Sequence, residues 1–263
     1  LYRKRFETRP YERQAGATDA AFDHHVMRVA EAVGRRDFLP TVVHALEALD
    51  GIDTEPRGTR PAVGLIGDRY MMVNSLLNNG LVEHVERLGG EVWLTPYCTD
   101  YLRAQGYLYP KMLRKTGRFA AALVHSIRHI VQMRDYDRIE QLFAPFLIND
   151  REPTLAEIIA YAQPYFPPEM EVPIIGNVAK AVDFARKGCA GLINLVPFGC
   201  LLGNAYAASF PRLRADHNGI PILNLVFDGL QATNQRTRLE AFMSQIRSRS
   251  VRRRTAAPAA TPH

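Results

Sequence analysis

The chain has 263 residues, of which 47% are hydrophobic and 23% are charged. This composition is typical of a folded globular protein and excludes disordered and collagen-like chains. The net charge of +6 is unevenly placed, because five of the eight residues from Arg247 to Arg254 are arginine. We expect the end of a solvated helix and a basic, disordered tail over residues 247–263. Nucleic acid is not an expected partner, because no aromatic residues interleave with these arginines.

The three cysteines, Cys98, Cys189 and Cys200, are too few for a disulfide framework. Reduced thiols and a cytoplasmic protein are therefore expected. No apolar run is long enough to cross a bilayer, and the first residues lead into polar sequence rather than a secretory apolar core. No membrane partner is expected. Because the chain starts at Leu1 rather than Met, we expect a piece of a longer polypeptide.

Residues 1–58 are predicted to form an N-terminal helical segment that ends in a linker rich in Gly and Pro. An α/β domain is expected over residues 59–246, with a helical insertion at about residues 100–168. Its predicted elements are strand 62–67, helix 74–88, strand 91–95, insertion helices 119–134 and 154–165, helix 177–187, strand 191–196, helix 205–215, strand 220–227 and helix 235–246. Strands that alternate with helices at this spacing are parallel and have right-handed crossovers. The sequence therefore predicts an α/β fold with a parallel sheet.

Ligands of open parallel sheets bind beyond the carboxyl ends of the strands. Three predicted strands end in suggestive residues: Pro96-Tyr97-Cys98, Pro197-Phe198-Gly199-Cys200 and Asp228-Gly229. In a single sheet, Cys98 and Cys200 would meet at one edge. Cys200 also precedes a predicted helix, whose N-terminus favours the thiolate that binds metals. A buried cysteine that only packs is the alternative for each position, and it is the interpretation we favour for Cys189.

Other motifs are weaker. His125 and His129 share one helix face, but no Glu occupies the metalloprotease position and the surroundings are basic, so we expect partly exposed side chains. His24 and His25 are expected at the surface. The turn at Gly64–Gly67 has too few glycines for a dinucleotide fingerprint, although Gly67-Asp68-Arg69 could line a cleft or contact a phosphate. No nucleophile elbow is present.

Several segments resemble one family. They are Gly188-Cys189-Ala190-Gly191-Leu192-Ile193-Asn194, Pro197-Phe198-Gly199-Cys200-Leu201-Leu202-Gly203, Ile220-Pro221-Ile222-Leu223, Asp228-Gly229, Thr233-Asn234 and Thr237-Arg238-Leu239-Glu240-Ala241-Phe242, with Thr8-Arg9-Pro10-Tyr11-Glu12 and Leu88-Gly89-Gly90-Glu91-Val92 upstream. Together they resemble acyl-CoA dehydratase activase-related proteins, relatives of 2-hydroxyacyl-CoA dehydratases and benzoyl-CoA reductases. The resemblance covers most of residues 1–246.

The resemblance implies Rossmann-like lobes with helical additions, and an iron–sulfur cluster, [4Fe-4S] or related, in the cleft between lobes. It implies Cys200 and Cys98 as metal ligands, with Gly199, Gly203 and Asp228 at the cofactor. Such a cluster takes three or four thiolates, so an upstream cysteine-bearing lobe would share it. The implied partners are this lobe, an ATP-dependent activase domain and an acyl-CoA.

The leading hypothesis is therefore a cluster-binding lobe in low-potential electron transfer to a CoA-thioester system, not active as an enzyme alone. Asp228, Asn234 and Arg238 could shape the cleft, or Arg238 could form a structural ion pair. The alternative function is a non-catalytic interaction module that kept the fold and lost the cluster.

Overall fold

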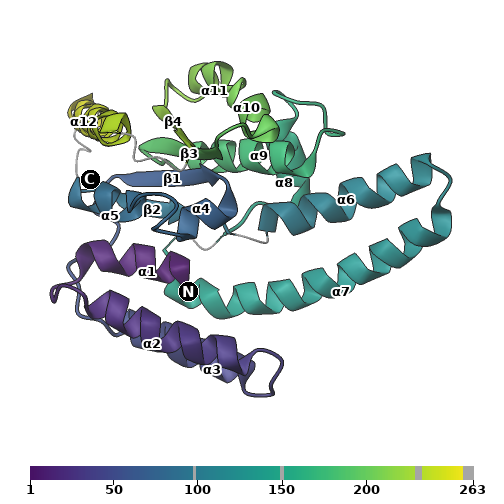
Figure 1. The fold of residues 1–263 in the computed structure, drawn as a ribbon, viewed down its shortest axis with the longest axis horizontal. Helices are drawn as coiled ribbons and strands as arrows, with labels where there is room; N and C mark the ends of the chain where they lie inside the picture. The colour runs from purple at the N-terminus through teal and green to yellow at the C-terminus, as the bar shows by residue number, and fades with distance from the viewer. Residues whose placement is uncertain (97–98, 149–150, 229–232, 257–263) are drawn as a thin grey trace, which may run out of the picture.

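The fold is built on four parallel strands in the order β2-β1-β3-β4 (Figure 1). We describe a computed structural model, which covers residues 1–263 except 97–98, 149–150, 229–232 and 257–263. The strands are β1 (Ala62–Gly67), β2 (Glu91–Leu94), β3 (Gly191–Pro197) and β4 (Ile222–Phe227). The predicted α/β class with a parallel sheet is confirmed, and helices cover both faces, as parallel sheets require.

One face of the sheet packs against helices α4 (Arg69–Val73), α5 (Leu81–Arg87) and α12 (Thr233–Ala256). Alternate strand residues such as Leu65, Ile193 and Leu225 point into this layer and are almost completely buried. Side chains alternate between the faces of a strand, so their neighbours point into the opposite layer. The resulting core includes Val85, Met243 and Ile246.

The core on the opposite face is shared with α9 (Val172–Arg186), α10 (Leu201–Ala207), α11 (Phe210–Asp216) and α8 (Leu155–Ala162), which packs on α9. Gly64 permits the closest approach, because a Cβ there would lie 2.4 Å from the ring of Phe184. A buried ion-pair network ties α9 to the segment before α8: Lys180 pairs with Glu152 and, at 3.0 Å, with Asp183. Buried charges are tolerated in this layer because each has a partner.

The N-terminal helices are α1 (Tyr2–Thr8), α2 (Ala17–Ala32) and α3 (Phe38–Asp50), with a 3-10 turn at Arg9–Tyr11. Arg9 joins them to the α/β body, since its guanidinium donates to Glu86 at 2.8 Å and contacts Asp19 at 3.2 Å. Tyr11 donates to Glu91 at 2.6 Å.

His25 was expected at the surface, and this was wrong. It is buried and its ring lies 5.3 Å from that of His44, and burial lowers its pKa.

Between β2 and α9 the chain forms a helical hairpin of α6 (Thr99–Lys115) and α7 (Phe119–Phe143), followed by a 3-10 turn at Ala144–Phe146. The hairpin extends away from the sheet (Figure 1). Among the described residues, no helix is both long and apolar enough to cross a membrane.

Thr154 begins α8 with a capping box to Glu157, as its position before an apolar run predicts.

Two predicted helices are not continuous in the structure. Within the helix predicted over 74–88 only α5 is helical, and it is preceded by a turn in which Asn79 and Gly80 adopt positive φ angles of 55° and 65°. Asn78 fixes this break, since its side chain accepts from the Leu81 N–H and donates to the Met71 carbonyl. The helix predicted over 205–215 is two helices, and Pro211 lies in the first turn of the second, where its missing N–H costs nothing.

The last helix is longer than predicted, because α12 continues from Thr233 through the arginine-rich run to Ala256. Arg247 donates to the Leu88 carbonyl at 2.9 Å, and Arg249 donates to the Gly219 carbonyl at 2.6 Å. These two arginines therefore hold α12 against neighbouring turns. Residues 257–263 of the predicted tail lie outside the described residues.

Candidate functional site

The order of the strands creates a switch point between β1 and β3. The chain leaves β1 toward β2 on one side and leaves β3 toward β4 on the other. The two loops that follow these central strands diverge, and open α/β sheets bind ligands in the resulting crevice. A cleft of about 450 Å³ lies there, lined by Gly67, Asp68, Arg69, Tyr70, Pro173, Asn177, Pro197, Cys200, Leu202, Gly203 and Tyr206.

The turn after β1 is fixed by its backbone. Gly67 has a φ of +112°, and a Cβ there would lie 2.2 Å from the Leu195 carbonyl oxygen, so only glycine fits. Its N–H donates to the Asn177 side chain at 2.8 Å, and the Asp68 N–H donates to the Leu195 carbonyl at 2.8 Å. Asp68 then caps α4 by accepting from the Met71 N–H. This turn places Arg69 at the cleft, as the sequence suggested.

Cys200 lies at the corresponding turn after β3. Gly199 provides the positive φ of 74° that lets the chain reverse, and Cys200 becomes the residue that caps α10. Its Sγ accepts a hydrogen bond from the Gly203 N–H at 3.3 Å. Gly203 allows this approach, because a Cβ there would lie 2.5 Å from Val196. The sulfur is thus half-buried, oriented by the backbone and part of the cleft wall.

A chain of hydrogen-bonded side chains leads from Tyr206, which lines the cleft, to the strands β3 and β4. The Tyr206 hydroxyl donates to Asn194 at 2.9 Å, and Asn194 donates to Asn224 at 2.7 Å. Burial raises the pKa of Tyr206, and the neighbouring Cys200 acts in the same direction. Tyr206 is therefore a neutral hydrogen-bond donor at neutral pH. Asn177, Asn194 and Tyr206 were not predicted as site residues, although a polar Asn194 inside an apolar strand was a usable signal.

The other predicted site residues have different placements. Asp228 follows β4 and is exposed, and it does not line the switch-point cleft. Cys98 lies outside the described residues. Cys189 is buried at the opposite end of β3, where burial raises the pKa of its thiol, in agreement with a packing role.

The remaining candidates are structural. Arg238 donates to the Asn224 carbonyl at 2.7 Å, and no ion pair joins it to another described residue. His129 fills the space above Gly106, and His125 contacts the Tyr109 ring at 4.6 Å, so both pack between α6 and α7. Gly64 is covered by Phe184 and leaves no room for a phosphate.

Among the described residues, the thiolates available near Cys200 are fewer than an iron–sulfur cluster needs. A cluster of four irons takes three or four thiolates. Within the described residues, Cys200 is the one cysteine at this edge, and no group of three or more His, Cys, Asp or Glu side chains could hold a metal. The described residues therefore offer one oriented sulfur and do not complete a cluster site by themselves.

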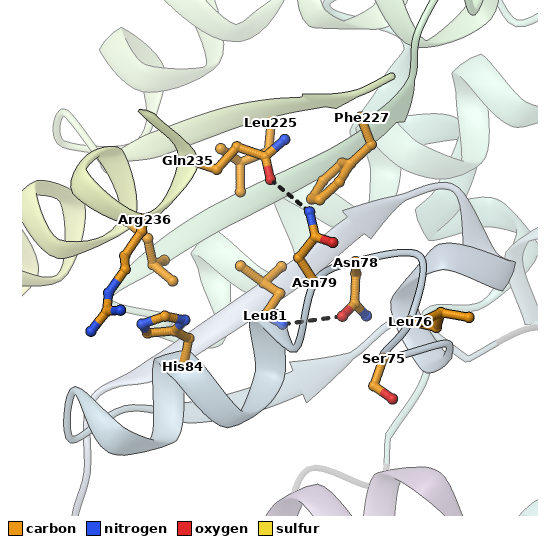
Figure 2. Close-up of a pocket in the computed structure, with 11 residues that line it drawn as sticks. Ser75, Leu76, Asn78, Asn79, Leu81, His84, Leu225, Phe227, Gln235 and Arg236 are labelled. Carbon is orange, nitrogen blue, oxygen red and sulfur yellow. Dashed lines mark hydrogen bonds between the residues drawn. The ribbon is translucent and has the colours of Figure 1, made fainter. Parts of the chain in front are cut away.

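A larger cleft of about 570 Å³ lies on the other face of the sheet, between the segment around α5 and the start of α12. Asn79 and Gln235 meet across it at 3.4 Å, and His84 and Arg236 lie on opposite walls (Figure 2). Burial lowers the pKa of His84, and Arg87 and Arg236 act in the same direction. Among the described residues that line it, Leu225 and Phe227 are apolar, Ser75 and His84 are polar, and none carries a carboxylate or a thiol.

Comparison with protein-family models, with curated proteins and with solved structures found no match to this chain.

Proposed function

We propose that this chain is a cluster-binding lobe in which Cys200 supplies one thiolate to an iron–sulfur cluster shared with a second, cysteine-bearing lobe. The observation that supports the proposal is the placement of Cys200 at the switch point, with its sulfur held by the Gly203 N–H. Hydrogen bonds to sulfur are a means by which proteins tune clusters. When bound, a cluster would supply one-electron transfer at low potential.

The residues of this chain have simpler tasks in the proposal. Gly199 and Gly203 give the backbone its close path around the sulfur. Asn194 orients the hydroxyl of Tyr206 at the cleft wall, and Arg69 on the same wall supplies a positive charge. This charge suits an anionic group, such as a thioester substrate linked to CoA. The activase, the acyl-CoA and a cytoplasmic location belong to the same proposal.

Anaerobic reconstitution tests the role of Cys200. The chain is incubated with ferrous iron, sulfide and a small thiol that can supply the missing ligands, and then desalted. We expect bound iron and sulfide with visible charge-transfer absorbance. Cys200→Ala should abolish both, whereas Cys189→Ala should retain them because that thiol only packs.

Two results would contradict the proposal. A folded, colourless wild-type chain under these conditions would favour the alternative, a non-catalytic interaction module. Colour retained in Cys200→Ala would move the site to other residues. A parallel Cys98→Ala variant tests the second predicted ligand, and circular dichroism confirms that each variant is folded.

A further inference from the structure

The hairpin of α6 and α7 carries a surface that the body of the protein does not cover. The N-terminal half of α7 packs on α6, while its other end lies near α3 and the turn at Ala144–Phe146 (Figure 1). The inner side of α7 is well filled: Ala122 is buried, and His129 lies against Gly106. The opposite side of this half faces away from α6.

That outer side is apolar. Its six large side chains are each 55–67% exposed, and they are Phe119, Leu123, Val124, Ile127, Ile130 and Val131. At 100° per residue they cover an arc of about 140° around the helix. The seam between two paired helices is narrower, because it uses only two positions in seven. An arc this broad instead suits a flat apolar layer.

The part of the hairpin around its tip is strongly basic. Residues 111–134 contain six Lys or Arg side chains and no Asp or Glu: Lys111, Arg114, Lys115, Arg118, Arg128 and Arg134. Lys111 pairs with Glu169 at 2.7 Å, and the structure shows no ion pair between the other five and any described residue. Arg114, Lys115 and Arg118 gather at the exposed tip. A second copy of the chain would bring the same positive charge and be repelled.

We propose that the outer face of α7, from Phe119 to Val131, lies on an anionic lipid surface. The apolar arc would enter the boundary between headgroups and acyl chains, while the cations at the tip and at Arg128 and Arg134 contact acidic headgroups. Apolar burial together with Lys and Arg beside it is the usual basis of interfacial binding. The arm lies on the membrane and does not cross it. This proposal does not depend on the cluster.

Sedimentation with vesicles tests it on the whole chain. We expect binding to vesicles of phosphatidylcholine mixed with phosphatidylglycerol, weak or no binding to phosphatidylcholine alone, and loss of binding as salt increases. Leu123→Glu with Ile127→Glu should weaken binding by at least about tenfold, because two apolar side chains leave the interface. Arg114→Gln with Lys115→Gln should weaken it by about fivefold for each charge.

The control is Met27→Glu, which changes an equally exposed apolar residue on α2 and should bind as the wild type does. All these positions are exposed, and matching thermal unfolding confirms that the variants fold. Equal binding to neutral vesicles, or no binding at all, would overturn the proposal. Binding that survives Leu123→Glu with Ile127→Glu would assign it to the arginines near the C-terminus instead. Lipid-free dimers that this double variant abolishes would identify a second copy as the occupant.

Discussion

Cys189 and Cys200 stand in contrasting environments only eleven positions apart in the sequence. Cys200 is half-buried at the cleft, whereas Cys189 is buried and its thiol has a raised pKa. Because the thiolate is the reactive form, Cys200 should be alkylated by iodoacetamide in the folded protein and Cys189 only after unfolding. Mass spectrometry of digested samples with and without denaturant measures this. Equal labelling of both in the native state would contradict the structure.

Gly67 is the backbone position on which the cleft depends most. Gly67→Ala should lower the free energy of unfolding by at least about 3 kcal/mol, because it adds a clash with the Leu195 carbonyl to the strain of a positive φ. Gly188→Ala is the matched control, since Gly188 also has a positive φ but open space around it. It should cost only about 1 kcal/mol. Urea denaturation compares the two, and equal losses would rule out the clash.

Part of the candidate site followed from the sequence. Cys200 was predicted because parallel strands end at one edge, which required only the position of β3, whereas Gly203 was expected from the family resemblance. Asn177 and Tyr206 could not be found in that way. Both lie on helices, and their approach to the cleft depends on how α9 and α10 pack against the sheet. Asp228 satisfies the same strand-end rule as Cys200, yet β4 is at the edge of the sheet and away from the switch point.

At the scale of elements, the strands were predicted better than the helices. All four strands were predicted, because short apolar runs bounded by Gly or Pro are typical of buried strands. The predicted positions of the helix ends were less accurate. Asn79 breaks the helix predicted over 74–88 by adopting a positive φ, which depends on side-chain hydrogen bonds of Asn78 that periodicity does not reveal.

Two glutamates should give opposite pH dependences. Burial raises the pKa of Glu7 in α1 above its ordinary value of 4.5. The folded protein therefore loses stability as the pH rises from 4.5 through this raised pKa, because the buried carboxyl must ionise. The Thr154 N–H and Arg151 lower the pKa of Glu157 at α8 to about 2, so its contribution is present above 4.5 and is lost as pH falls toward 2.

Substitution by Gln removes each dependence. Glu7→Gln should become more stable relative to the wild type as pH rises above 4.5, and its amide oxygen can still accept from the Ile148 N–H. Glu157→Gln should be less stable than the wild type at pH 7, and the difference should shrink on acidification. Urea midpoints across this pH range measure both. Parallel curves for wild type and Glu7→Gln would contradict the direction given for Glu7.

For the whole molecule, the projecting hairpin and the sheet should differ in local stability. The first half of α7 packs on one helix, whereas β1 and β3 are buried between two layers. Peptides from residues 108–130 should therefore exchange their amide hydrogens well before those from β1 and β3. Hydrogen exchange with mass spectrometry tests this. Equal protection of the hairpin and the central strands would show that the arm is covered in solution.

The pairing of β1 with β3 has a consequence for how the molecule assembles. Val63 pairs with Val92 of β2, which is near in the sequence, but also with Gly191 of β3, far beyond the hairpin. The pairing at the centre of the sheet thus joins residues that are far apart in the sequence. Closing the long loop between them costs entropy, so this pairing is expected to form late in folding. During synthesis one edge of β1 stays unpaired until β3 has been synthesised. We expect slow folding, with an intermediate in which β1 and β2 expose an unpaired edge and are prone to aggregate.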